Sequence, residues 1–238
     1  MQEWGENPPS ESSFLLKGNV LLLLLALVLT FALASCTTQI NSEIEHSSLG
    51  LQPNDLEIHG VGFLTPAAAT GQETDKQSLS LMFADELTQM RPYARVAPLP
   101  EVLSAVNEHG LADDYKQMYR DYLETGILEQ DVLSKVGEVS GVRYLIQLSL
   151  AGFAQDDNKR LGILGLRLVD TKQATMRVFM QIWDSQTGSV VWEGTEEVHF
   201  AYDTGAEKPV TFKTIAERTA QEFFALLPGA DSSLVALD

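Results

Sequence analysis

The chain has 238 residues, and its 33 acidic side chains against 16 basic ones give a formal net charge of −17 at pH 7. This balance argues against nucleic acid as a partner, because binding to nucleic acid depends on neutralising phosphates with lysine and arginine. It argues equally against electrostatic adhesion to anionic lipid head groups. We interpret the acidity as a source of solubility.

An apolar run from Val20 to Leu33 dominates the N-terminal region, and among its 14 residues only Thr30 is polar. As a helix the run would rise about 21 Å, whereas the hydrocarbon core of a bilayer is about 30 Å thick. It is therefore too short to span a membrane, and it matches the apolar region of a secretory signal peptide, which has about 7–15 residues.

Leu33, Ala34, Ser35 and Cys36 close this run and resemble the lipobox of bacterial lipoproteins. The resemblance implies that residues 1–35 are a signal peptide and that the thiol of Cys36 receives a diacylglyceryl group. Cleavage before Cys36 then exposes an amine that is acylated in turn, with palmitate as the expected acyl group. The alternative is an inert or buried thiol, since a lone cysteine forms no internal disulfide.

The residue after Cys36 is Thr37, whereas Gram-negative lipoproteins retained in the inner membrane tend to have aspartate there. The resemblance therefore implies the periplasmic face of the outer membrane, and the inner membrane if this sorting rule fails. Upstream, the three glutamates of residues 1–15 outnumber Lys17, although a signal peptide should begin positive. We predict that translation starts near residue 15 or 16, at a leucine-type codon.

Composition divides the chain after the signal peptide into three parts. Residues 36–55 are polar and without periodicity, which predicts a lipidated N-terminus and a flexible tether. Residues 56–228 carry the apolar patterns of one globular domain, and a mature chain of this length can form one sizeable core. Residues 229–238 are predicted to fray.

The first half of the domain is predicted to be largely helical. A short strand over 56–64 and a loop over 65–76 lead into a helix that begins near Leu79 and is closed by Pro92. After a brief strand over 93–97, the region 99–140 contains three helices. Each ends at a glycine, which best tolerates the left-handed cap geometry: Gly110, Gly126 and Gly141.

The second half is predicted to be mostly strand. Residues 142–153 form an apolar run that suits a central strand buried on both faces. Along 176–183 apolar and polar residues alternate, with Met176, Val178, Met180 and Ile182 on one face. The remaining predictions are a turn cluster at 156–159, strands over 161–169 and 189–202, a hairpin turn at 185–188 with Gly188 available for a positive φ, and an amphipathic helix over 210–227.

This order predicts one α/β (α+β) domain with a mixed five- to six-stranded sheet and amphipathic helices packed on it. The hairpin sequence Asp-x-x-Thr-Gly-x-Val-Val-Trp over 184–192, preceded by the glycine-capped segment 141–146, resembles a group of periplasmic lipoproteins. That group contains the curli-secretion lipoproteins, the penicillin-binding-protein activators and the N-terminal domain of the Tol propeller protein. Trp183 and Trp192 flank the hairpin, and we expect them to pair across the strands.

No constellation of reactive groups is visible in the sequence. The histidines are isolated, without spacing for a metal site: His46, His59, His109 and His199. Gly-x-Ser-x-Gly, phosphate-binding and dinucleotide-binding patterns are absent. The paired carboxylates of 113–114 and 196–197 are adjacent in sequence and therefore point to different faces. We predict no catalytic residues, no cofactor, no metal and no enzymatic activity.

Tyr115, Tyr119 and Tyr122 share one face of a predicted helix. The first interpretation is a face packed on the sheet, and the alternative is a partly exposed surface that recognises a partner, because tyrosine is enriched at interfaces. The loop 64–76 is a second candidate contact.

Together these features predict a membrane-anchored, non-catalytic periplasmic lipoprotein that binds a protein partner in cell-envelope assembly or maintenance. Tethering by the lipid would raise its local concentration near that partner. The alternative is a subunit of an oligomeric outer-membrane secretion pore, as the curli-group resemblance implies, and a hydrolase comes third. The oligomeric state stays open.

Overall fold

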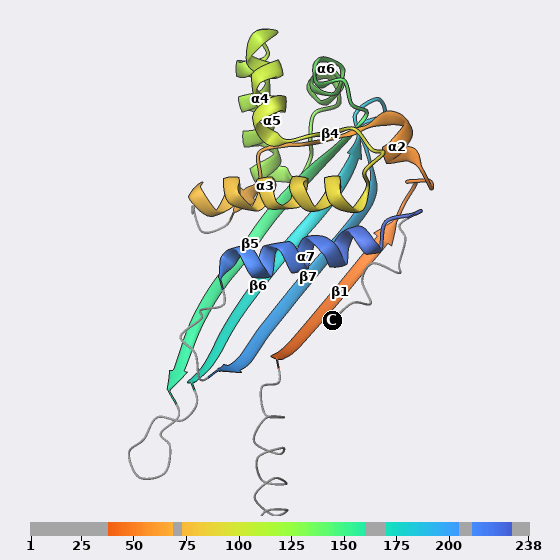
Figure 1. Cartoon of the computed structure of the whole chain (residues 1–238). Coiled ribbons are helices and arrows are strands. Elements are labelled where there is room, and N and C mark those ends of the chain that lie inside the picture. The colour runs from red at the N-terminus through yellow and green to blue at the C-terminus, as the bar shows by residue number, and fades with distance from the viewer. Residues whose placement is uncertain (1–37, 69–72, 160–169, 205–210, 230–238) are drawn as a thin grey trace, which may run out of the picture.

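The computed structural model describes residues 38–68, 73–159, 170–204 and 211–229. Its described elements form one mixed α/β domain with a seven-stranded sheet and six helices (Figure 1). In chain order they are β1 Thr38–Ser48, α2 Asp55–His59, β2 Val61–Phe63, β3 Ala67–Ala68, α3 Glu73–Met90, β4 Val96–Ala97, α4 Leu99–Glu108, α5 Ala112–Thr125, α6 Gln130–Ser140, β5 Tyr144–Lys159, β6 Asp170–Asp184, β7 Ser189–Thr204 and α7 Phe212–Ala225.

The strands lie in the order β1-β7-β6-β5-β2-β4, and the short β3 pairs with β5. The four long strands β1, β7, β6 and β5 are antiparallel to one another, whereas β2 and β3 pair with β5, and β4 with β2, in parallel. The short strands meet β5 only over 144–150, so the second half of β5 runs on beside β6 alone. The sheet is therefore broad at one end and narrows to four strands at the other.

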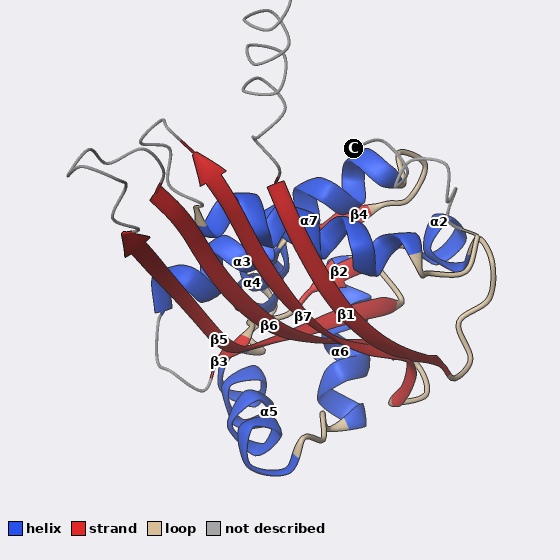
Figure 2. Cartoon of the chain, turned by 90° about the horizontal axis from the view of Figure 1, so that it is seen from below, coloured by secondary structure: helices blue, strands red, loops and turns tan. Residues whose placement is uncertain are grey.

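Helices cover the two faces of the sheet unequally. Helices α3 and α7 pack along one face, and α5 and α6 lie on the other side at the broad end (Figure 2). Val102 and Val106 of α4 belong to the same hydrophobic core as α5 and α6. The face of β6 predicted from its alternation is confirmed, because Met176, Val178, Met180 and Ile182 are all fully buried under α3 and α7. Two hydrophobic cores result, one on each side of the sheet.

The residues that end the helices behave as predicted. Gly126 and Gly141 follow α5 and α6 in the left-handed conformation, with φ of 73° and 65°. Pro92 comes two residues after Met90, the last residue of α3. At the start of α7, a cap that was not predicted forms: the hydroxyl of Thr211 accepts a hydrogen bond from the backbone N–H of Thr214. These signals are local, so the sequence is sufficient to place them.

The N-terminal segment differs from its prediction. Residues 38–48, expected to belong to a flexible tether, form strand β1, which pairs with β7 along its whole length from Thr38 opposite Tyr202 to Ser48 opposite Trp192. Ser42 and Ile44 turn toward the α7 side of the sheet, while Glu43 and Glu45 are exposed. The segment was not predicted as a strand because it is polar. An edge strand can be polar, since one of its faces is exposed to water.

Three smaller expectations are also corrected. The strand predicted over 56–64 is the short helix α2 followed by β2, and residues 156–159 continue β5 instead of forming a turn. Trp183 and Trp192 do not pair, because a register shift after Ile182 puts Trp183 in the core under α5 and α6 and Trp192 in the core under α7. The predicted strand 161–169 lies outside the described residues. Within the described residues, the sheet contains two strands that were not predicted, β1 and β3.

A search of the described helices finds none with the length and apolar character needed to cross a membrane.

Candidate functional site

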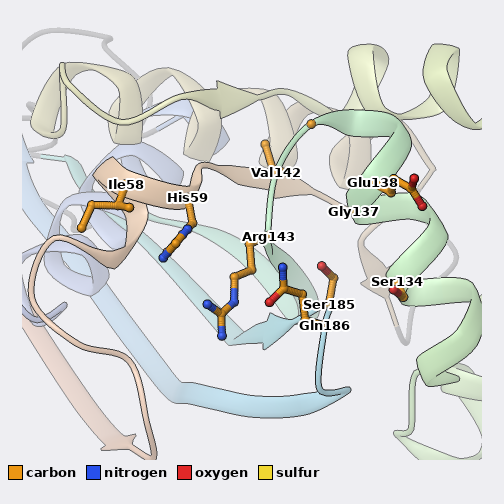
Figure 3. A pocket seen from close by; sticks show the side chains of 10 residues that line it. Ile58, His59, Ser134, Gly137, Glu138, Val142, Arg143, Ser185 and Gln186 are labelled. Atoms are coloured by element: carbon orange, nitrogen blue, oxygen red, sulfur yellow. The ribbon is translucent and has the colours of Figure 1, made fainter.

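A polar cavity of about 480 Å³ opens at the broad end of the sheet (Figure 3). We call it the Arg143 pocket. Four elements line it: helix α2, the second half of α6, the segment leading into β5, and the β6–β7 hairpin. The lining residues are Ile58, His59, Ser134, Gly137, Glu138, Gly141, Val142, Arg143, Ser185 and Gln186.

An ion pair between Arg143 and Asp184 fixes the floor of the pocket. The guanidinium donates from Nε to Asp184 Oδ1 at 3.0 Å and from Nη2 to Oδ2 at 2.7 Å, which is the bidentate geometry that favours arginine. Asp184 Oδ1 also accepts from the backbone N–H of Gln186 at 3.0 Å, and Ser185 N–H donates to the Arg143 carbonyl at 2.9 Å. The pair therefore connects the hairpin to the start of β5.

Helix α2 is joined to the same segment by hydrogen bonds. Arg143 N–H donates to the His59 carbonyl at 3.0 Å, and Tyr144 N–H donates to the Gly60 carbonyl at 3.2 Å. The hydroxyl of Tyr144 donates to Asp55 Oδ2 at 3.0 Å. The pocket walls are thus held by backbone as well as side-chain contacts.

These contacts also set the protonation states. The hydrogen bonds from Arg143 hold the pKa of Asp184 below its ordinary value, and the same pairing raises the pKa of Arg143. Burial, with the hydrogen bond to Asp55, raises the pKa of Tyr144 to about 12. At neutral pH Asp184 and Arg143 stay charged and Tyr144 stays neutral, so none of the three is poised as a general acid or base.

The rim of the pocket offers binding groups but no reactive pair. Ile58 is 69% exposed and adds an apolar side chain beside the polar cavity. Within the described part of the chain, no hydrogen bond joins His59 to the hydroxyl of Ser134 or Ser185, the contact that a serine nucleophile and its base require. The same residues contain no group of three His, Cys, Asp or Glu side chains close enough to hold a metal ion.

The open face of the four long strands is charged. Four exposed or half-exposed glutamates line it together with Arg177 and His199: Glu43, Glu45, Glu193 and Glu197. Arg177 donates from Nε to Glu197 at 2.8 Å, and this pairing lowers the pKa of the Glu197 carboxyl. The hollows between these side chains are shallow, about 240 and 290 Å³.

The tyrosines singled out in the sequence lie mostly in the core. Tyr115 and Tyr122 are each 7% exposed, and together with Met118 they form the buried face of α5. The Tyr115 hydroxyl accepts from Thr65 N–H at 2.9 Å, and the half-buried Tyr119 donates to the Pro66 carbonyl at 2.9 Å. The packing interpretation therefore describes this face. The expectation of an exposed recognition surface is wrong for Tyr115 and Tyr122, because α5 buries both against the sheet.

Two other predicted sites have different outcomes. Leu33, Ala34, Ser35 and Cys36 lie outside the described residues. The candidate contact loop 64–76 is partly core, since Leu64 and Ala67 are buried and Ala67–Ala68 pair with β5 as β3.

Sequence reasoning missed the pocket, although two of its signals were visible. Arg143 is a charge at the head of an apolar run, and Asp184 ends the alternating strand before the hairpin. They are 41 residues apart, and only the antiparallel register, in which Tyr144 lies opposite Asp184, brings them together.

No protein-family model and no characterised protein matches the sequence. Among solved structures, the PelC dodecamer from Paraburkholderia phytofirmans aligns over 80% of this chain and all of its own, with 12% identity and a TM-score of 0.46. Lipoprotein GNA1162 from Neisseria meningitidis aligns over 68% of this chain and 96% of its own, with 10% identity and a TM-score of 0.42. The LpoB C-terminal domain from Salmonella enterica aligns over 63% and 84%, with 12% identity and a TM-score of 0.31. We derive no function from similarities at this level.

Proposed function

We propose that this protein is a membrane-anchored, non-catalytic periplasmic lipoprotein that binds a protein partner in cell-envelope assembly or maintenance. Cys36 carries the lipid anchor, on the periplasmic face of the outer membrane. The Arg143 pocket binds the partner. The observation that carries the proposal is this pocket, which has hydrogen-bonded polar walls and an exposed isoleucine at its rim but no paired reactive groups among the described residues.

The chemistry of the pocket indicates what kind of segment it binds. Its walls present hydrogen-bonding groups from α6 and from the hairpin, and Arg143 adds a positive charge that Asp184 already neutralises in part. Ile58 adds apolar surface at the edge, where a partner side chain can be desolvated. A peptide segment that combines polar backbone with one apolar side chain fits such a site.

Photocrosslinking in the host membrane tests the binding site. A photoreactive amino acid replaces Gln186, an exposed residue at the rim. In a protein that is otherwise unchanged we expect one discrete protein adduct. The variant I58D should lose that adduct, because it places a charge where the partner buries apolar surface.

The matched control is L123D, which changes another exposed apolar residue, 53% exposed, at the end of α5. L123D should keep the adduct, and circular dichroism should show that both variants fold. An adduct that persists in I58D, or that both variants lose, would overturn the assignment of the pocket.

The pore alternative finds less support. A strand in contact with lipid needs an apolar outward face. One face of the long strands is covered by α3 and α7, and the other carries Arg177 and Glu197 among its exposed charges. We therefore do not extend the proposal to a pore; detergent-extracted rings in electron microscopy would reverse this choice.

A further inference from the structure

Strand β1 begins at Thr38, two residues after Cys36. Consecutive Cα atoms are about 3.8 Å apart, so the Cα of Cys36 lies within about 7.6 Å of the Cα of Thr38. No tether of useful length separates the expected lipid attachment from the folded sheet. This contradicts the picture of a domain that moves freely on 20 flexible residues, which the composition of 36–55 favoured.

The end of the sheet where β1 begins is also where three other strands begin or end. Thr38 pairs with Tyr202 near the end of β7, and Asp170, the first residue of β6, pairs with Lys159 at the end of β5 and with Thr204. Figure 1 shows β1 running from this narrow end toward α2 at the broad end. Two residues of backbone thus connect the expected lipid to the narrow end of the sheet.

We infer that the lipid holds the domain with the narrow end of the sheet against the membrane surface and the Arg143 pocket facing away from it. The inference rests on the proposed function for the lipid on Cys36. Strand β1 has 11 residues, and at about 3.3 Å per residue it spans roughly 33 Å. Ser48 at its far end pairs with Trp192, and the hairpin that lines the pocket lies beyond Trp192. The end of β1 beside the pocket therefore stands up to roughly 33 Å above the lipid head groups.

Charge does not supply this orientation. The chain carries 33 acidic side chains against 16 basic ones. A protein of this charge is not attracted to anionic head groups. The exposed face with Glu43, Glu45 and Glu197 opposes a flat orientation on anionic lipid for the same reason. The short covalent connection remains as the cause, so the orientation should not depend on salt concentration.

Energy transfer to the membrane tests the inference. The full-length protein is produced with its lipid, reconstituted in phosphatidylcholine vesicles that contain dansyl-labelled phosphatidylethanolamine, and excited at tryptophan. Asn41 near the start of β1 and Ser189 at the start of β7 are both exposed strand residues at opposite ends of the sheet. N41W should gain transfer to dansyl over the wild-type protein, whereas S189W should gain none.

A second variant isolates the connection. Twelve Gly and Ser residues inserted between Thr37 and Thr38 should remove most of the gain of N41W, because the domain then leaves the surface. Equal transfer from N41W and S189W, or a gain that the insertion leaves unchanged, would overturn the proposed orientation. Neither result would contradict the proposed lipid on Cys36. Mass spectrometry of the N-terminal peptide separates the two ideas: a peptide without lipid overturns the proposed anchor and the orientation together.

Discussion

Glu196 and Glu222 share the hydroxyl of Ser42 between the sheet and helix α7. The hydroxyl donates to Glu222 Oε2 and lies 3.4 Å from Glu196 Oε1, and Arg218 Nε donates to the other oxygen of Glu222 at 2.6 Å. Glu196 is fully buried. A serine hydroxyl has one proton to give, so a protonated Glu196 can complete the chain by donating to Ser42. The cluster joins β1, β7 and α7 and requires one neutral carboxyl.

The pH dependence of stability should reveal that proton. Burial, followed by the charge of Glu222, raises the pKa of Glu196 from 4.5 to about 9. Between those values the folded protein holds a proton that the unfolded chain has lost, so Glu196 makes stability fall by about 1.4 kcal/mol per pH unit as pH rises. E196Q should remove this slope and stabilise the protein at pH 8. Urea unfolding at pH 6, 7 and 8 measures the difference.

The control for that experiment is E197Q, at the adjacent and exposed position. Pairing with Arg177 lowers the pKa of Glu197, so its titration lies below pH 4.5, outside the measured window. Its slope should match the wild type. If E196Q and the wild-type protein give parallel lines, Glu196 is ionised in the folded protein and the assignment of the proton is wrong.

The Arg143–Asp184 pair should contribute measurably to stability. Asp184 is 5% exposed and Arg143 29%, so the pair is largely shielded from solvent. D184N keeps the shape but loses the charge, and we expect a loss of about 1.5–3 kcal/mol at pH 7, the range for hydrogen bonds to charged groups. Because the folded pKa of Asp184 is lowered from 3.8, its contribution is present above that value and lost as pH falls through the folded pKa.

The difference between D184N and the wild type should therefore shrink below about pH 4. E101Q is the comparison, since the Arg95–Glu101 pair is about half exposed on both sides and such pairs contribute about 0–1 kcal/mol. Chemical unfolding at pH 7 and pH 3.5 measures both. Equal losses from D184N and E101Q at pH 7 would contradict a structural role for the pocket floor.

Gly137 permits the close packing of α6 on the hairpin. A Cβ at this position would lie 2.8 Å from Ser185 Cβ and 2.9 Å from the Val142 carbonyl oxygen, closer than real Cβ contacts. G137A should cost about 1–3 kcal/mol by overpacking, although alanine favours helix. S134A on the exposed side of the same helix should change stability by less than about 0.5 kcal/mol. Thermal unfolding of the two variants gives the comparison, and a neutral G137A would mean that the hairpin shifts freely.

The Tyr115 hydroxyl should matter because it is buried with a partner. In the wild-type protein the Thr65 N–H lies 2.9 Å from the Tyr115 hydroxyl oxygen, which accepts its hydrogen bond. Y115F removes that acceptor, and an unsatisfied buried group costs about 1–3 kcal/mol. Y93F changes a tyrosine that is 88% exposed and should be neutral. Urea unfolding distinguishes them. Two neutral variants would place Tyr115 at the surface and return its helix face to consideration as a recognition surface.

Much of the fold follows from short-range patterns. The alternation of 176–183 identified the buried face of β6, and the apolar run of 142–153 identified the central strand, because a period of two residues needs no knowledge of the partner strands. The glycine stops after α5 and α6 were equally clear. The strand count was short by one or two, since β1 lacks an apolar run and β3 has only two residues.

The candidate site was much less visible. Tyr115 and Tyr122 were noted for their helical spacing, but whether a helical stripe is core or surface depends on what packs against it. Arg143 and Asp184 were noted only as parts of a motif. No pattern within either segment indicates that their side chains form one ion pair.

The strands, the helix stops and the alternation of faces thus follow from local sequence, because backbone geometry repeats every two or 3.6 residues. The expected lipid on Cys36 belongs to the same level, since it depends on four consecutive residues. The edge strand β1, the Arg143 pocket and the neutral Glu196 come from contacts between distant segments; Ser42 and Glu196 are 154 positions apart. The burial of these residues and their charge states depend on tertiary contacts, because a pKa or an ion pair is set by the neighbouring groups that folding brings close.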